Sequence, residues 1–232
     1  MSDVNLNVIL FQASIWVLPV LIAITLHEAA HGWVAWRLGD DTAYMLGRVT
    51  FNPLRHIDAF GTVIMPALLL FLSGGRLMFG YAKPVPVNFG RLGRPRRDMV
   101  FVAAAGPSIN LALAVASAAA MYLVPLLPGD VARWVFLNLK NSVWINALLC
   151  VFNMLPIPPL DGGRVAVGLL PDSLARPLAR LERVGILIIL LGLFLLPWLG
   201  GQIGVSLDVF WWLVGAPAEY LSRTVYTLVG LG

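Results

Sequence analysis

Two histidines and a glutamate within five residues, His27, Glu28 and His31, are the side chains of this sequence best spaced for chemistry. Side chains four residues apart on a helix lie one turn above each other, so both imidazoles can reach one metal ion. Glu28 lies about 100° round the helix from His27, where a carboxylate can face a metal-bound water without binding the metal itself. The spacing predicts a hydrolytic zinc site, and the alternative is a chance match to a five-residue pattern.

The position of this motif favours function over chance. It lies in an apolar run from about Val8 to Trp36, which is long enough to cross a hydrocarbon core of about 30 Å. Ionisable groups at that depth are costly unless they are partnered, so they are functional candidates by default.

The sequence limits which residue completes such a site. Catalytic zinc takes three protein ligands and keeps one position for water. Cys150 is the only cysteine, so the ligands must be histidines and carboxylates. Asp161, which precedes Gly162 and Gly163, is the best carboxylate candidate, and the alternative is an ordinary turn aspartate. The third histidine, His56, is expected to be a surface or structural residue.

Two asparagines near apolar runs are further candidates. Asn110 and Asn153 could donate hydrogen bonds to a developing oxyanion or to an extended substrate backbone. The alternative for each is a hydrogen bond to a neighbouring helix, and the sequence does not distinguish the two roles.

Composition identifies the class of protein. The chain has 232 residues, of which 59% are hydrophobic and 12% charged, and its mean hydropathy is +0.84. About a quarter of the residues in soluble domains are charged, so this composition indicates an integral membrane protein in a lipid bilayer. The net charge of +4 could suggest nucleic-acid binding, but the basic residues are confined to particular loops, which orientation in a bilayer explains better. We expect no nucleic-acid partner and no cleavable signal peptide.

Further apolar runs predict more membrane helices, at about 99–126, 134–155, 184–199 and 205–214. We therefore expect an all-α polytopic membrane protein with about four to six transmembrane helices, a re-entrant segment and a small membrane-associated β-hairpin. A single domain is expected over residues 1–232, with the motif-bearing core at about 8–165 and C-terminal helices at about 184–232.

Three stretches break the helical pattern. The apolar run from Phe60 to Leu72 has only about 13 residues, a length typical of re-entrant segments rather than full spans. Prolines between Gly80 and Asn88 disfavour helix and predict an edge strand or hairpin. The prolines at 156, 158 and 159 predict an unwound segment that presents Asp161 from a turn.

Orientation follows from the distribution of basic residues. If the two histidines and Asp161 form one site, the C-terminal ends of their helices lie at one membrane face, and residues 60–72 must return to the face that they left. The segments on that face then carry 13 of the 16 lysines and arginines. The positive-inside rule makes this face cytoplasmic and places the N-terminus outside.

Together these motifs resemble those of a known family. The chain is similar to the site-2 protease family, the intramembrane zinc metalloproteases of peptidase family M50, in His27-Glu28-Ala29-Ala30-His31, Gly106-Pro107-Ser108-Ile109-Asn110, Asn153 to Pro156 and Leu160 to Gly163. Two further stretches, Gly47 to Pro53 and Ala82 to Asn88, resemble the short bacterial branch of that family. The chain shows no inserted PDZ domain or appended CBS domain, so control by such modules is not expected.

The resemblance implies a role for each candidate residue. The ligands of one zinc ion per chain would be His27, His31 and Asp161. Glu28 would be the general base, and Asn153 would assist the substrate or the transition state. The stretch that matches the family's substrate-binding β-hairpin contains Lys83, Val85 and Val87, and Asn110 belongs to the second motif.

The resemblance also implies an activity and a location. The expected reaction is hydrolysis of a peptide bond within or near a transmembrane segment of a membrane-protein substrate, as in regulated intramembrane proteolysis. The expected location is the bacterial inner membrane, with the active site toward the cytoplasm.

Two other functions use similar residues. A zinc-binding transporter or scaffold would bind the metal without hydrolysis, and a transporter would place further ionisable residues along a path through the bilayer. Asp130 and Asp208 do not suggest such a path. A zinc protease that processes prenylated proteins would need a second glutamate-containing motif in a later span, and none is evident.

Overall fold

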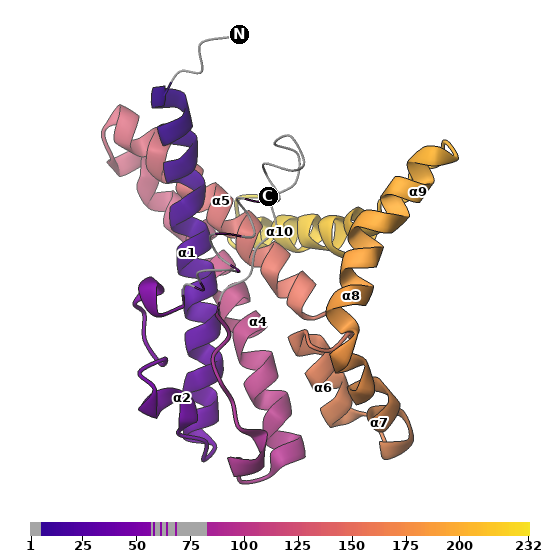
Figure 1. The fold of residues 1–232 in the computed structure, drawn as a ribbon. Helices are drawn as coiled ribbons and strands as arrows, with labels where there is room; N and C mark the ends of the chain where they lie inside the picture. Colours follow the sequence, from indigo (N-terminus) through magenta and orange to yellow (C-terminus); the bar gives the residue numbers. More distant parts are fainter. Residues whose placement is uncertain (1–5, 57, 59–60, 62–63, 65–67, 69–82) are drawn as a thin grey trace.

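The computed structural model describes residues 6–56, 58, 61, 64, 68 and 83–232 (Figure 1). Within these residues the regular structure is entirely helical. The helices long and apolar enough to cross a membrane are Leu6–Arg37, Pro95–Leu126, Gly129–Asn153 and Gly185–Gln202. The expected all-α polytopic class is therefore confirmed, and these helices fall within the predicted number of spans.

Three long helices form the bundle that carries the site. They are α1 (Leu6–Arg37), α4 (Pro95–Ala120), which the 3₁₀ turn η4 (Met121–Leu126) extends, and α5 (Gly129–Asn153). Proline at the start of α4 suits a helix N-terminus, where its missing N–H needs no partner. Helix α5 begins five residues before the predicted start at Trp134, directly after Pro128 at its N-cap. Helix α4 packs against both α1 and α5.

Small side chains on α4 make this close packing possible. Ala114 and Ala118 are fully buried and join Val143 of α5 and Val225 near the C-terminus in one apolar cluster. A second cluster, Ala35 with Leu92 and Val102, ties the end of α1 to the start of α4. Helices whose facing side chains are small can approach closely, so α4 is the interior helix that its alanines predict.

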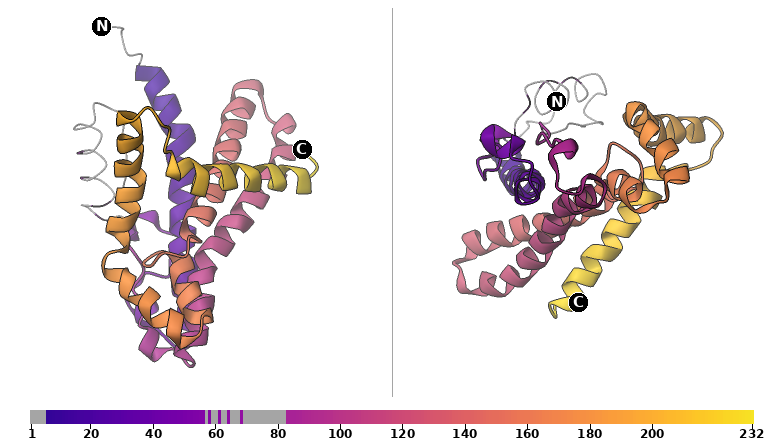
Figure 2. Two further views of the ribbon diagram at one scale, coloured as in Figure 1. Left: turned by 90° about the vertical axis from the view of Figure 1, so that its right-hand side faces the viewer. Right: turned by 90° about the horizontal axis from the view of Figure 1, so that it is seen from below.

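The remaining helical elements of the described residues are short. They are α2 (Thr42–Met45), η1 (Pro53–Arg55), η3 (Phe89–Arg91), α6 (Asp161–Leu169), α7 (Asp172–Arg180), η5 (Leu181–Arg183), α8 (Gly185–Leu190), the π-helical turn η6 (Leu191–Leu195), α9 (Leu196–Gln202), the π-helical turn η7 (Trp211–Gly215) and α10 (Ala216–Leu228). Helix α10 runs across the long helices rather than along them (Figure 2). The stretch 205–214, predicted to be a membrane helix, is not among the described helices long and apolar enough to cross a membrane; residues 205–208 are not helical, and the chain then continues through η7 into α10.

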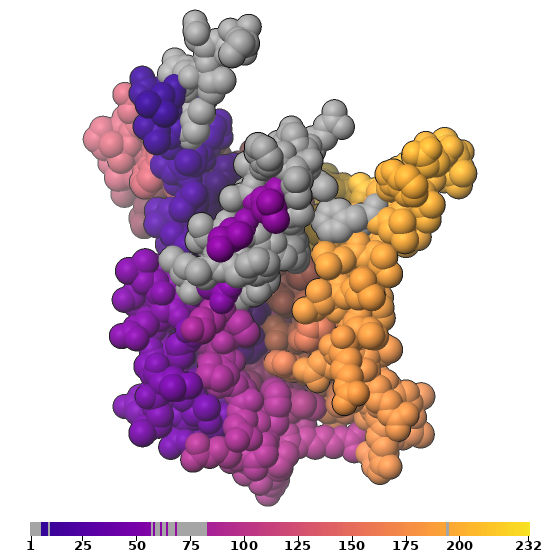
Figure 3. Space-filling view, viewed as in Figure 1, coloured from indigo at the N-terminus to yellow at the C-terminus, as the bar shows by residue number. Residues whose placement is uncertain are grey.

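One end of the molecule gathers the segments that matter for the site. The C-terminal end of α1, the start of α4 and helices α6 and α7 all lie at the lower end of Figure 1. Arg96 at the start of α4 reaches both of these short helices: it donates to Gly168 O of α6 at 3.2 Å and pairs with Asp172 of α7 at 2.5 Å. The magenta and orange-brown parts of the chain meet near the lower edge of Figure 3.

The predicted β-hairpin is wrong. Lys83–Asn88 is extended, but the described part of the chain contains no strand with which it could pair. Pro84 and Pro86 have no N–H to donate to a ladder. The N–H groups of Val85 and Asn88 donate to side-chain carboxylates instead. Residues 80–82 of the expected hairpin lie outside the described residues, as does most of the expected re-entrant segment 60–72, which stays a prediction.

Candidate metal centre

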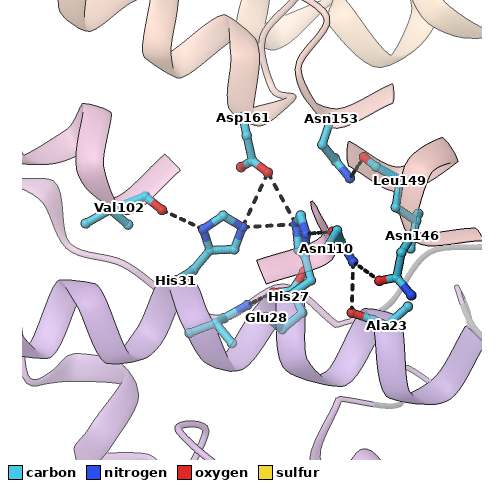
Figure 4. Close-up of polar contacts among 11 residues, drawn as sticks. Ala23, His27, Glu28, His31, Val102, Asn110, Asn146, Leu149, Asn153 and Asp161 are labelled. Atoms are coloured by element: carbon cyan, nitrogen blue, oxygen red, sulfur yellow. Dashed lines mark hydrogen bonds and ion pairs between the residues drawn. The ribbon is translucent and has the colours of Figure 1, made fainter. Parts of the chain in front are cut away.

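Three buried side chains from two elements converge on one point (Figure 4). His27 Nε2 and His31 Nε2, both on α1, lie 3.0 Å apart. Asp161 Oδ2, on the first residue of α6, lies 3.2 Å from the first nitrogen and 3.4 Å from the second. The arrangement offers one ligand atom from each of three residues to a single ion.

The chain after α5 is folded tightly to bring Asp161 to the histidines. Pro156 to Leu160 is not helical, as the three prolines predict. A β-carbon on Gly162 would lie 2.2 Å from Met154 O, and one on Gly163 would lie 2.2 Å from Pro158 N. Only glycine allows so close a return of the backbone, so the two glycines after Asp161 are required by this fold.

These three residues fit a zinc ion. Bonds of about 2.0–2.1 Å in a tetrahedral site place neighbouring ligand atoms about 3.3 Å apart, and the three separations are 3.0, 3.2 and 3.4 Å. Asp161 Oδ2 is buried without a hydrogen-bond partner. Burial raises the pKa of this carboxyl, but the adjacent imidazoles outweigh burial and hold the pKa below its usual value. Two nitrogens and a carboxylate oxygen make a common donor set for catalytic zinc.

The outer nitrogen of each imidazole also has a partner. His27 Nδ1 lies 2.6 Å from Asn110 Oδ1 on α4. His31 Nδ1 lies 2.7 Å from the backbone carbonyl of Val102, also on α4. Partners of this kind orient the ring of a metal-binding histidine. Helix α4 therefore holds both rings with their Nε2 atoms toward Asp161.

Gly106 lets α4 come this close to the histidines. A β-carbon on Gly106 would lie 2.5 Å from His27 Cε1 and 2.5 Å from His31 Nε2. Real β-carbons do not make such contacts, so this position accepts no side chain without movement of the rings. The second sequence motif thus contributes to the site at both of its ends. Gly106, its first residue, packs against the histidines, and Asn110, its last residue, is a partner of His27.

Glu28 lies beside the three ligand candidates and is not one of them. Its Oε2 accepts a hydrogen bond of 2.7 Å from the backbone N–H of Val85. Val85 is buried, and its Cγ1 lies 3.1 Å from the β-carbon position of Gly32 on α1. The extended segment Lys83–Asn88 therefore runs directly over the face of α1 that carries Glu28.

Other contacts hold this segment at both ends. Lys83 N donates to His56 O at 2.9 Å, and the guanidinium of Arg48 donates to the carbonyls of Lys83 and Pro84. At the far end, Asn88 N donates to Asp40 at 2.6 Å. His56 is itself buried, with Nε2 3.1 Å from Thr50 O, so it belongs to this support.

The two asparagine candidates lie differently. Asn110 is fully buried between helices, bonded to His27 and Asn146. Asn153 lies at the end of α5, where its Nδ2 donates to Leu149 O at 3.0 Å (Figure 4). The amide of Asn110 is thus committed to helix contacts, whereas that of Asn153 is tied only to its own helix.

The sequence analysis gave Gly106 no role beyond its place in the second motif, and it did not single out Val102 or Asn146. The contacts of Gly106 and the Val102 carbonyl are backbone features of the packing and leave no side-chain signal. Asn146 has a signal, because Asn138, Ser142 and Asn146 place polar side chains at four-residue intervals along α5. Such a stripe lies on one helix face and indicates a polar interior contact.

Comparisons with known proteins agree with this geometry. The family model described as "Peptidase family M50" matches residues 15–130 and 124–197. The protein named "Putative zinc metalloprotease YwhC" of Bacillus subtilis is 37% identical over 185 residues, which cover 78% of this chain and 80% of that protein. The protein named "Putative zinc metalloprotease Rip2" of Mycobacterium tuberculosis is 33% identical over 193 residues, which cover 83% of this chain and 70% of that protein. No solved structure gives a significant match.

Proposed function

The chain belongs to peptidase family M50 and is an intramembrane zinc metalloprotease, and from this premise we propose which of its residues carry out the reaction. The family, together with the four apolar helices found in the described part of the chain, makes it an integral membrane protein that acts on membrane-protein substrates in a lipid environment. The residue roles, the metal count and the orientation given below are our proposals.

The metal ligands are His27, His31 and Asp161, which bind one zinc ion per chain. The observation that carries this assignment is the convergence of their three ligand atoms within 3.0–3.4 Å of one another. Bound zinc would supply an activated water and would polarise the carbonyl of the scissile peptide bond.

Glu28 is the general base. It lies next to His27 in the sequence, beside the ligands but not among them, and its carboxylate can take a proton from a nucleophilic water. The Val85 N–H holds one oxygen of this carboxylate. The other oxygen has no hydrogen-bond partner within the described residues and is the one assigned to the proton transfer.

The extended segment Lys83–Asn88 binds the substrate. A peptide bond inside a helix is already hydrogen-bonded, so the substrate must unwind before attack, and its freed backbone groups then need partners. Among the described residues, no hydrogen bond occupies the backbone N–H or carbonyl of Val87. We assign Lys83, Val85 and Val87 to substrate contact. The backbone groups of Val87 pair with the substrate backbone, whereas the N–H groups of Lys83 and Val85 are already bonded to His56 and Glu28.

The asparagines have separate roles. Asn153 assists the substrate or the transition state, because its amide is bonded only to a carbonyl of its own helix and can change partner. Asn110, which was a candidate for the same role, supports His27 instead, because its side chain is fully buried and bonded on both sides.

The active site faces the cytoplasm of a bacterial cell. The end of the molecule that holds the site also holds the start of α4 and helix α7, where Arg94, Arg96, Arg97, Arg176 and Arg180 lie. Such a concentration of basic residues marks the cytoplasmic end of a membrane protein.

One experiment tests the function. Protein purified in detergent is analysed for metal and then incubated with a model transmembrane peptide, with and without a zinc chelator. We expect about one zinc per chain and cleavage that stops when zinc is removed and returns when it is restored. Zinc binding without cleavage of any such peptide would favour the zinc-binding scaffold or transporter.

A further inference from the structure

A buried chain of amides runs from the candidate metal centre into the bundle (Figure 4). His27 Nδ1 lies 2.6 Å from Asn110 Oδ1, and Asn110 Nδ2 donates to Asn146 Oδ1 at 2.8 Å. Asn146 Nδ2 in turn donates to the Ser142 carbonyl at 2.9 Å and lies 3.2 Å from Ser142 Oγ. Asn110 and Asn146 are both fully buried. The chain therefore links α1, α4 and α5 away from solvent.

The Ser142 carbonyl sets which amide groups in this chain of hydrogen bonds are donors and which are acceptors. A backbone carbonyl can only accept a hydrogen bond, so Asn146 must turn its amide nitrogen toward Ser142 O. The side-chain oxygen of Asn146 then faces Asn110 and must receive a hydrogen from it. A second carbonyl, Ala23 O, lies 3.4 Å from the same Asn110 nitrogen and orients it in the same sense.

This direction decides which nitrogen of His27 carries the hydrogen. Asn110 presents its oxygen to His27, and an amide oxygen can only accept, so the ring hydrogen must be on Nδ1. A neutral imidazole has one ring hydrogen, so Nε2 keeps a free lone pair. Nε2 is the atom that faces Asp161 and His31, and a histidine must offer a free lone pair to bind a metal.

We propose that Asn146 is a positioning residue that fixes, through Asn110, the tautomer in which His27 can bind the metal. Without Asn146, the Asn110 nitrogen loses its acceptor, and the amide is free to turn over and donate to His27 Nδ1. The ring hydrogen would then move to Nε2 and block the metal-binding lone pair. The inference rests on the proposed function only in taking His27 as a ligand.

His31 serves as an internal reference. Its Nδ1 faces the Val102 backbone carbonyl, which can only accept and cannot turn over. The tautomer of His31 is therefore fixed without any side-chain amide. Loss of Asn146 should change the hydrogen position on His27 and leave that on His31 unchanged.

The first test is zinc affinity, measured on the purified full chain by competition with a chelator. Asn146→Leu should weaken zinc binding by about tenfold or more, the usual cost of losing a group that orients a metal ligand. The matched control is Asn138→Leu, because Asn138 is buried on the same helix but donates only to Trp134 O. We expect the control to bind zinc like the parent.

Two outcomes would contradict the inference in different ways. If the parent binds no zinc, the proposed function fails as well. If the parent binds zinc and the two variants bind it equally, only this inference is overturned.

The second test separates tautomer control from packing. In Asn110→Asp, a carboxylate presents an acceptor to His27 whichever way it turns, so Asn146 is no longer needed for the tautomer. Adding Asn146→Leu to this background should cause no further loss of zinc affinity. An equal loss in both backgrounds would show that Asn146 only packs. If Asn146→Leu does not fold, Asn146→Ala and Asn138→Ala take the places of the leucine variants with the same expectations.

The third test observes the ring hydrogens directly. Nitrogen NMR of metal-free protein with labelled histidine reports the tautomer of each ring, and the chain has three histidines. In the parent, a hydrogen should be present on Nδ1 of both His27 and His31. In Asn146→Leu, the signals of His27 should shift toward the other tautomer while those of His31 stay. An unchanged His27 in that variant would overturn the inference.

Discussion

Glu28 Oε2 accepts a hydrogen bond of 2.7 Å from the backbone N–H of Val85, which joins the helix of the metal-ligand candidates to the extended segment Lys83–Asn88. The segment is also fixed at its ends, through His56 O and through Asp40. The proposed base and the proposed substrate-binding segment are therefore held in one arrangement. A substrate that pairs with this segment is brought next to Glu28.

The first prediction concerns Glu28. Glu28→Gln should keep zinc, since both histidines and Asp161 remain, but should lower the cleavage rate by about 10²–10⁴-fold because an amide cannot accept the proton of water. The glutamine oxygen can still accept from Val85, so the segment should stay in place. Metal content and peptide cleavage measured on one preparation check this. Cleavage at the parental rate would remove Glu28 from the role of base.

The second prediction tests Asp161 as a ligand rather than a turn residue. A turn role needs only a short side chain that accepts a hydrogen bond, so Asp161→Asn would then be nearly silent. A ligand role needs the negative charge, because an amide is a much weaker donor to zinc. We expect Asp161→Asn to lose zinc and cleavage while the protein stays folded and inserted. Asp130→Asn, at an exposed site, is the control, and full zinc occupancy in Asp161→Asn would place the third ligand elsewhere.

Much of the site follows from local rules that a sequence displays. Helical periodicity places His27 and His31 on one face, and prolines end α5 before Asp161. The long apolar runs predicted the membrane helices within a few residues at most ends. Two predictions miss. Helix α5 begins earlier than expected, because a run of mixed polarity after Pro128 is helical in spite of its composition, and the stretch 205–214 is not among the described helices that could cross a membrane.

The sequence does not show which groups accept the hydrogen bonds of a non-helical backbone. The Pro-Val-Pro-Val pattern after Lys83 predicted a hairpin, but extended backbone does not say what its N–H groups will bind. Here the N–H groups of Val85 and Asn88 donate to Glu28 on α1 and to Asp40 just after it. The same limit hides the Val102 carbonyl and the contact of Gly106 with the histidines, because both depend on how α4 packs on α1.

The third prediction concerns membrane orientation. Single cysteines at exposed Arg94 and Ser173 should be labelled from the cytoplasmic side by a membrane-impermeant thiol reagent, and one at exposed Asp130 from the opposite side. The background is Cys150→Ser, which removes the only native cysteine. Basic residues gather near the first two positions, as the positive-inside rule requires of a cytoplasmic face. Labelling of Arg94→Cys and Ser173→Cys from different sides would contradict a shared face for the two halves of the site.

The fourth prediction concerns acid sensitivity. Burial raises the pKa of Asp40. Hydrogen bonds from Thr42 and from Asn88 N, together with the charge of Arg91, lower the pKa by more than burial raises it, so the pKa lies below its usual value. A lowered pKa stabilises the fold above the unfolded pKa of about 3.9, and this stabilisation is lost as the pH falls through the folded pKa. Thermal unfolding should show Asp40→Asn less stable than the parent near neutral pH, with the difference shrinking below about pH 4. A difference that is constant with pH would contradict this role of the charge.

The last prediction tests the close approach of α4 to the histidines. Gly106→Ala adds one methyl group at a point 2.5 Å from His27 Cε1 and from His31 Nε2. Overfilling a packed interior typically costs about 1–3 kcal/mol, and here the movable neighbours are the two imidazoles rather than the helix backbone. The rings must leave the positions in which they face Asp161 together, so we expect zinc affinity and cleavage to fall together while the membrane helices persist. Gly129→Ala, at a position with open space around it, should bind zinc like the parent. Parental zinc affinity in Gly106→Ala would mean that the rings have room to move without losing the metal, and that α4 orients them through Asn110 and Val102 alone.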